Sequence, residues 1–391
     1  MAARNHIAGL DGLRAIACLA VFGVHLQQQT GLSGKAGAFD IKLLLANGNT
    51  GVCLFFMLSG FLLSLPFWMN DQREDESRGL SWAGGFALRR IGRIVPAYYL
   101  CLFGLVALGA HEGVRDVVLH TLFLHNLSEA TIYSINEPFW TLAVQAQFYV
   151  VFAVLMLMLA PLAKNRGAMV MLLAVLSVGA FTGHLAVMKK FNPSPGDNVL
   201  SHSILAHLPH FLVGMVAALF FAATHRTDEA GQTRRSLLSD VLFWLALAGI
   251  VIIIGVCAQD AHWRIPRLIA DDARMLGRYN YPYVPMLIGV LLVTAPQAKI
   301  TTALLQFRPL RSIGIISYGV YVYHLPCLSF VNKLMTKANM PVSEHWIFFG
   351  TTGLALALVV ALASYALIER PLLKWSKRRS RHQASDQPPE A

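Results

Sequence analysis

The chain has 391 residues, of which 55% are hydrophobic and 14% are charged. Soluble domains carry about 25% charged residues, so this composition excludes an ordinary soluble protein. The formal net charge is +11, but the basic residues cluster in short segments between long apolar runs. This placement is typical of membrane-protein loops that face anionic lipid headgroups, and it argues against a nucleic-acid partner.

Ten apolar runs have roughly the length needed to cross a hydrocarbon core about 30 Å thick. They lie at residues 9–28, 50–69, 93–110, 139–161, 167–187, 203–223, 240–258, 281–297, 312–332 and 346–368. We therefore predict an all-α fold, a polytopic transmembrane helical bundle of about ten spans. Ten spans place both termini on one side, and the excess of Lys and Arg on that side predicts that both are cytoplasmic.

The domain organisation predicted from these runs is simple. One transmembrane domain covers 1–373, and a basic, then polar tail at 374–391 is expected to be disordered. The stretch 114–127 is amphipathic and too short to span, so an interfacial or re-entrant position is expected.

Ionisable residues within the first span are candidates for function, because charge at membrane depth is costly. Arg14 and His25 are eleven residues apart, so they share a helix face and lie about 16 Å apart along it. With a cytoplasmic N-terminus, Arg14 lies near the cytoplasmic end and His25 in the outer half. The alternative is that Arg14 snorkels and His25 anchors the helix at the interface.

Two further groups lie in the second and third runs. Ser59-Gly60, in a Phe-rich helix, would allow close approach of a ligand or of another backbone, and helix packing is at least as good an interpretation. Arg90 and Arg93 share one face at the cytoplasmic start of the third run. Two guanidinium groups suit a phosphate or pyrophosphate, although a positive-inside cluster would look the same.

The fourth and ninth runs carry hydrogen-bonding side chains. Trp140 precedes a stripe of Thr141, Gln145 and Tyr149, but neutral amides also bind helices together. In the ninth run, Tyr321 and His324 share one face, as an interfacial belt would.

A metal site is not predicted. His202, His207 and His210 have loose ligand-like spacing, but no carboxylate or Cys completes the set.

Six segments together form a recognisable pattern. They are GLDGLRAIACLAVFGVHL, FFMLSGFLLS, RRIGRIVPAYYL, HNL…PFWTLAVQAQFY, ISYGVYVYHLP and SYALIERPL, in that order between residues 9 and 373. In these segments the chain resembles the acyltransferase-3 family of integral membrane O-acyltransferases. The resemblance implies a cytoplasmic acyl donor, usually acetyl-CoA, with no permanently bound cofactor. It also implies an acceptor hydroxyl on a glycan or lipid-linked glycan, reached from the outer side of a bacterial cytoplasmic membrane.

The family motifs carry over onto particular residues. His25 falls on the catalytic histidine and Arg14 on its companion arginine. Arg90 and Arg93 fall on the RxxR motif linked to donor binding, and residues 59–61 fall on the SGF motif.

One position departs from the family pattern. The motif of the fourth span resembles WSLSVEEQFY, with a glutamate five residues after Trp, and here that position is Gln145. This puts in doubt an acid–base or charge-partner role there.

The mechanism expected from these residues has His25 as general base for the acceptor hydroxyl. An acyl-histidine intermediate is the less favoured variant. The residues expected to bind or orient the acceptor are Trp140, Gln145, Tyr149, Tyr321 and His324. Two rival hypotheses remain: a transporter of a polar substrate, and a catalytically silent relative acting in assembly.

Overall fold

The computed structural model describes residues 7–36, 39–69, 80–159, 166–191, 198–225, 233–254, 283–373 and 375. Its larger helices are α1 (Leu10–Thr30), α3 (Thr50–Met69), α4 (Leu80–Ala107), α6 (Phe139–Leu159), α7 (Arg166–Phe191), α9 (Ile204–Thr224), α10 (Leu237–Ile252), α12 (Tyr283–Thr294), α14 (Arg308–Lys337) and α15 (Trp346–Ser364). The smaller elements are β1 (Lys35–Ala36), β2 (Phe39–Asp40), α2 (Ile41–Ala46), η1 (Asn47–Asn49), α5 (Val114–Thr121), η2 (His125–Leu127), α8 (Asn198–Ser201), α13 (Ile300–Leu305) and the π-helical turn η5 (Tyr365–Glu369). Apart from Trp375, the predicted tail lies outside the described residues.

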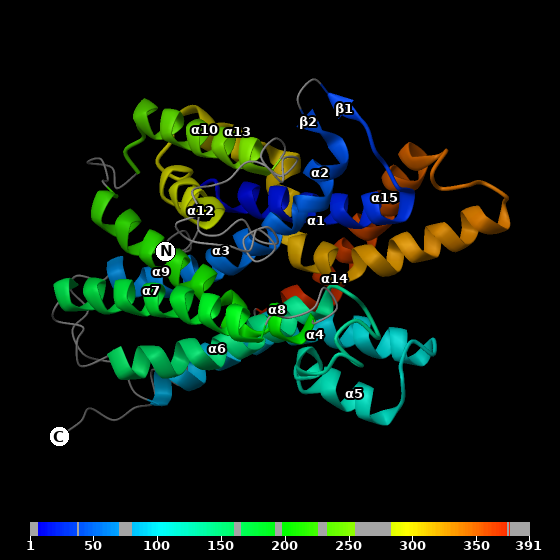
Figure 1. Ribbon diagram of the computed structural model, residues 1–391, viewed down its shortest axis with the longest axis horizontal. Helices are drawn as coiled ribbons and strands as arrows, with labels where there is room; N and C mark the ends of the chain where they lie inside the picture. Colours follow the sequence, from blue (N-terminus) through cyan, green and yellow to red (C-terminus); the bar gives the residue numbers. More distant parts are fainter. Residues whose placement is uncertain are drawn as a thin grey trace.

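Seven helical segments of the described chain are long and apolar enough to cross a membrane. They are Leu10–Thr30, Leu44–Met69, Arg90–Ala107, Phe139–Met158, Asn198–Thr224, Arg308–Lys337 and Trp346–Leu373. Shorter apolar helices occupy Gly167–Gly183, Leu237–Ile252 and Tyr283–Thr294. Several of the long helices, including α6, α7 and α14, extend along the longest axis of the molecule (Figure 1). The prediction of a polytopic helical membrane protein is confirmed.

The outward-facing surface of these helices is apolar. Val150 of α6, Met171 of α7, Leu245 of α10 and Leu367 of η5 are each more than 60% exposed. Large exposed apolar surfaces are rare on soluble monomers, whereas lipid favours them.

The helices at the centre of the bundle approach each other closely where glycines face a neighbouring backbone. Helix α1 packs against α3 and α14, and α3 packs most extensively against α9. A Cβ atom on Gly60 of α3 would overlap the carbonyl oxygen of Phe211 in α9, and one on Gly214 would overlap that of Met57. Small residues at membrane helix crossings allow this approach. Gly60 therefore serves helix packing, the interpretation that the sequence supported at least equally.

Substitution of Gly60 is expected to destabilise the protein. In Gly60→Ala the added methyl group must push α3 and α9 apart, at a cost of about 2 kcal/mol or more. The matched control is Gly104→Ala in α4, where a Cβ atom meets nothing within 4 Å. The control should be neutral or slightly more stable, because alanine is the better helix former. Thermal unfolding in detergent measures both, and equal melting temperatures would contradict the packing role.

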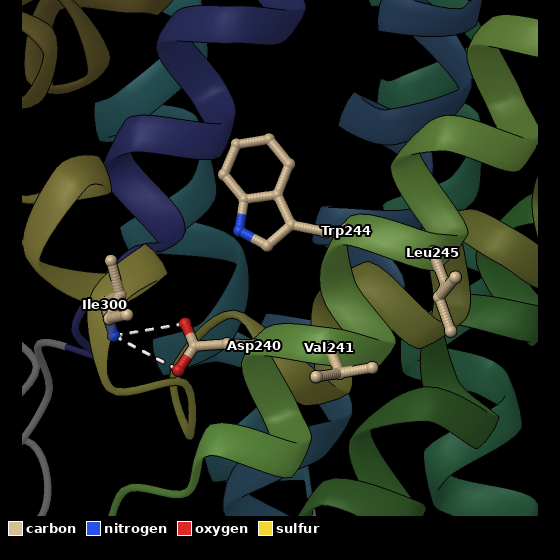
Figure 2. A pocket seen from close by; sticks show the side chains of 5 residues that line it. All are labelled: Asp240, Val241, Trp244, Leu245 and Ile300. Atoms are coloured by element: carbon tan, nitrogen blue, oxygen red, sulfur yellow. Dashed lines mark hydrogen bonds between the residues drawn. The ribbon is translucent and has the colours of Figure 1, made fainter.

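Asp240 joins α10 to the start of α13. Its carboxylate accepts hydrogen bonds from the backbone N–H groups of Lys299, Ile300 and Thr301 at 2.7–3.2 Å. The hollow beside it has otherwise aliphatic or aromatic walls, including Trp244 (Figure 2). Because the carboxylate already binds the helix start, this hollow is a poor candidate for a reaction site.

The segment 108–138 connects α4 to α6 and contains a buried polar cluster. Helix α5 is too short to span, as predicted for this stretch. Ser134 Oγ donates to Asp116 Oδ1 at 2.7 Å, and His120 Nδ1 lies 3.1 Å from the same oxygen. The rings of His120 and His125 stack in parallel with centroids 3.9 Å apart. The cluster therefore joins α5, η2 and the approach to α6.

Acid is expected to weaken this cluster. Burial lowers the pKa of His120, and burial together with the charge of His120 lowers the pKa of His125 to about 3. The unfolded chain therefore binds more protons in acid, so the stability is present above about pH 6.5 and is lost as the pH falls below it. The melting temperature should fall between pH 7 and pH 5, and it should fall less in His125→Phe. The control His111→Phe, on the exposed end of this segment, should behave as the wild type; an identical fall in all three proteins would refute the assignment.

Candidate active site

A polar cavity of about 100 Å³ lies between α1, α3, α14 and the segments that precede α6 and α9. It is lined by Val21, Val24, His25, Gln28, Asn49, Val52, Tyr133, Glu137, Pro138, Trp140, His202 and Tyr321. Three of these residues, His25, Trp140 and Tyr321, are sites predicted from the sequence. A cavity in which a histidine, a carboxylate, amides and aromatic rings converge has the composition of a binding or catalytic site.

His25 is 6% exposed and projects from α1 toward this cavity. Its Nδ1 atom lies 2.8 Å from Gln28 Oε1, one helical turn along. Because a carbonyl oxygen can only accept, this contact places the hydrogen on Nδ1 and leaves Nε2 with a lone pair. Glu137 Oε2 lies 3.9 Å from the same Nδ1 atom. The Nε2 atom is thus the one able to accept a proton.

Two predicted residues of α14 lie beside His25. The ring of His324 lies 5.0 Å from that of His25, centroid to centroid. His324 Nδ1 donates to the carbonyl oxygen of Tyr321 at 2.7 Å, and Tyr321 Oη accepts from Thr141 Oγ1 at 2.8 Å. These bonds fix the wall of the cavity that α14 and α6 share.

The stripe predicted on α6 continues from the cavity along the helix. After Thr141, Gln145 Oε1 accepts from Ser59 Oγ of α3 at 2.9 Å. One turn further, the Arg90 guanidinium lies over the ring of Tyr149, 5.8 Å from its centroid. The residues are spaced by four, so each step advances about 6 Å. Three separate contacts therefore follow one another along α6, from the wall of the cavity to Arg90 of α4.

The three arginines named from the sequence lie near one another. Arg14 Nη1 donates to Asp11 Oδ1 at 2.7 Å, and Arg14 is within electrostatic range of both Arg93 and Arg90. Like charges at membrane depth repel, so a cluster of this kind is typical of an anion site.

Helix α4 is held in place by α14. Tyr318 Oη donates to the carbonyl oxygen of Ile94 at 2.6 Å, and Tyr323 Oη donates to that of Ala97 at 3.2 Å. These bonds fix the start of the third span, and with it Arg90 and Arg93, relative to the helix that carries Tyr321 and His324.

Comparison with known proteins identifies the family. The acyltransferase domain model matches residues 7–364. The chain belongs to the acyltransferase 3 family. The resemblance stated from the six motifs is thereby confirmed.

Several curated relatives of this chain are named as bacterial O-acetyltransferases. It is 25% identical to the putative peptidoglycan O-acetyltransferase YrhL of Bacillus subtilis, over 94% of this chain and 55% of the relative. It is 22% identical to the peptidoglycan O-acetyltransferase OatA of Listeria monocytogenes, over 95% of this chain and 56% of the relative. A putative O-acetyltransferase of Staphylococcus aureus is 23% identical, with 95% and 58% coverage. The chain thus spans a little over half the length of these relatives, and no solved structure matches it significantly.

Five polar residues that line the cavity were not predicted from the sequence as site residues. They are Gln28, Asn49, Tyr133, Glu137 and His202. The spacing of His202 suggests only a loose metal ligand, yet its ring contacts the Trp140 ring edge-on, with centroids 4.2 Å apart, and its Nε2 lies 3.0 Å from Tyr133 Oη. Within the described ranges, no group of three or more His, Cys, Asp or Glu side chains is placed to hold a metal ion. The available signal for the missed residues was their shared position at the ends of different apolar runs that the predicted topology places on one side of the membrane.

Proposed function

We propose that this protein is a membrane-embedded O-acyltransferase that moves an acetyl or similar short acyl group from cytoplasmic acyl-CoA to an outer-side hydroxyl. The acceptor is a glycan or lipid-linked glycan. The protein acts in a bacterial cytoplasmic membrane, which it crosses ten times with both termini inside. The observation that carries the proposal is the placement of His25 in a polar cavity from which a stripe of polar residues on α6 runs toward Arg90.

The arginine cluster supplies the donor site. CoA carries phosphate groups, and guanidinium groups bind phosphate through paired, charge-assisted hydrogen bonds. Arg90, Arg93 and Arg14 bind the nucleotide end, and the acyl-pantetheine arm extends past Ser59 and Gln145 toward His25. Gln145 is four positions after Thr141, about 6 Å along α6, and Thr141 donates to Tyr321 in the cavity wall, so an extended arm can run along this stripe.

The chemical step uses the lone pair of His25 Nε2. This atom removes the proton from the acceptor hydroxyl while the hydroxyl oxygen attacks the thioester carbonyl carbon. The resulting tetrahedral oxyanion collapses with breakage of the C–S bond. The CoA sulfur then takes the proton from Nε2, so the histidine returns to its neutral form and the products are an ester and a free thiol.

The acceptor binds at the wall of the cavity formed by the segments that precede α6 and α9. Tyr133, Trp140 and His202 form an aromatic surface, and Asn49 and Gln28 add amide groups. Aromatic walls with a few convergent polar groups suit a sugar ring with its hydroxyls. The names of two relatives, which specify peptidoglycan, favour a glycan as acceptor.

The test uses the full chain in lipid nanodiscs with acetyl-CoA carrying a labelled acetyl group and a panel of glycan and lipid-linked glycan acceptors. Mass spectrometry should find the label as an alkali-labile ester on one acceptor class. Absence of transfer and of acetyl-CoA hydrolysis, in protein that is correctly folded and binds CoA, would refute the enzyme assignment.

A further inference from the structure

The carboxylate of Glu137 lies beside the candidate base. Glu137 precedes α6, in the turn Asn136-Glu137-Pro138, and Asn136 Nδ2 donates to the carbonyl oxygen of Val322 in α14 at 3.2 Å. This bond holds the turn against the helix that carries His324. Glu137 is 43% exposed at its side chain, whereas the side chain of His25 is 8% exposed. A half-exposed carboxylate therefore faces a buried imidazole.

The Nδ1 atom of His25 faces two acceptors at different distances. Gln28 Oε1 accepts its hydrogen at 2.8 Å, and Glu137 Oε2 lies 3.9 Å away. The amide fixes which ring nitrogen carries the hydrogen, and the carboxylate adds negative charge behind it. Both groups favour a proton on the other ring nitrogen, and they act against the burial of His25, which opposes it.

The other groups that face His25 supply no comparable charge. They are Tyr133 before α6, His202 before α9, and Tyr321 and His324 on α14. Phenols are uncharged near neutral pH and an imidazole never carries negative charge, so none of these groups favours a proton on His25 as a carboxylate does; the His324 ring, 5.0 Å away, would oppose it if protonated. Arg14, on the same helix, is eleven residues away and paired with Asp11. Among the described residues that line the cavity, Glu137 is the one carboxylate.

Gln145 does not take this position. Gln145 is eight residues after Glu137 and lies within α6. Its Oε1 accepts a hydrogen bond from Ser59 Oγ, and it does not line the cavity. The amide that stands where the family motif has a glutamate therefore leaves the surroundings of His25 unchanged. The departure at Gln145 consequently gives no reason to regard the base as unsupported.

We infer that Glu137 is a positioning residue for His25: its carboxylate stabilises the imidazolium that forms when Nε2 takes the hydroxyl proton. The inference rests on the proposed function for its catalytic meaning, whereas the pairing itself can be tested without turnover. Loss of this charge slows the proton-transfer step and leaves CoA binding, at the arginine cluster, unaffected.

The first measurement does not depend on activity. Carbethoxylation of His25, followed by peptide mass spectrometry over a range of pH, reports the fraction of neutral imidazole. In Glu137→Gln the midpoint of the reaction should move to lower pH, because the imidazole without a neighbouring carboxylate takes up a proton less readily. In Glu344→Gln, an exposed carboxylate in the segment between α14 and α15, it should not move. An unchanged midpoint in folded Glu137→Gln overturns the inference, whatever the activity.

The second measurement is steady-state acyl transfer in nanodiscs. Glu137→Gln should lower kcat about 10- to 100-fold, leave KM for acetyl-CoA within about twofold, and move the acidic limb of the pH–rate profile to lower pH. Glu137→Asp, which keeps the charge, should recover part of kcat, and it replaces the Gln variant if that variant fails to fold. A wild-type rate in Glu137→Gln would overturn the inference and leave the proposed function standing. A wild type without transfer would instead refute the proposed function.

Discussion

His25→Ala should abolish acyl transfer, with a loss of about 100- to 10,000-fold in kcat, the range associated with removal of a general base. The reason is geometric. Nδ1 is held by Gln28 Oε1, so Nε2 is left to accept the hydroxyl proton inside the cavity. Measurement of labelled acetyl transfer in nanodiscs, at saturating acetyl-CoA, separates this loss of kcat from a change in donor binding.

The control for this variant is His345→Ala, because His345 precedes α15 and contacts the carbonyl oxygen of Pro341 rather than the cavity. It should retain wild-type activity. His25→Ala should also bind CoA with unchanged affinity, since Arg14 lies about 16 Å away along α1 and Arg90 and Arg93 belong to a different helix, α4. Full transfer by His25→Ala, in protein shown to be inserted and folded, would contradict the mechanism.

The double variant Arg90→Gln/Arg93→Gln should weaken CoA binding by about 100-fold, equivalent to about 3 kcal/mol for two charge-assisted hydrogen bonds. Glutamine keeps much of the side-chain length and hydrogen-bonding capacity but removes the charge that phosphate requires. The rate at saturating donor should fall much less than the affinity. Calorimetric titration with CoA gives the affinity directly.

A matched pair of arginines controls for general charge. Arg234 and Arg235 precede α10 and are exposed, and the topology predicted from the sequence places their segment on the cytoplasmic side. Arg234→Gln/Arg235→Gln removes the same net charge and should leave the affinity within about twofold. If both double variants bind CoA equally well, the arginine cluster is an ordinary positive-inside feature and not a donor site.

The sequence was sufficient to predict a polytopic helical membrane protein and the polar stripe on α6, although seven segments rather than ten are long enough to span in the described chain. Apolar runs of bilayer length have few alternatives to a helix in lipid, and residues spaced by four must share a face. Thr141, Gln145 and Tyr149 accordingly contact Tyr321, Ser59 and Arg90. Helix periodicity alone gives the face, but not the neighbouring helix that this face meets.

The contacts between distant segments could not be predicted in this way. Glu137 and His202 lie in short connections whose backbone has no periodic pattern, and they reach the cavity because α9 packs against both α3 and α6. Gly60 illustrates the reverse case. Its sequence context allowed a ligand or a helix as its neighbour, and the neighbour is the Phe211 backbone. Tertiary packing, rather than local pattern, decides such positions.

The central claim is that an acyl group enters on the Arg90 side of the membrane and leaves on the His25 side. Proteoliposomes with oriented protein test it directly, with labelled acetyl-CoA supplied on one face and the glycan acceptor on the other. Labelled ester should form when the donor is on the Arg90 face and the acceptor on the His25 face, without net passage of either solute. Ester formation only when donor and acceptor share one face, or passage of the solute without transfer, would contradict the account.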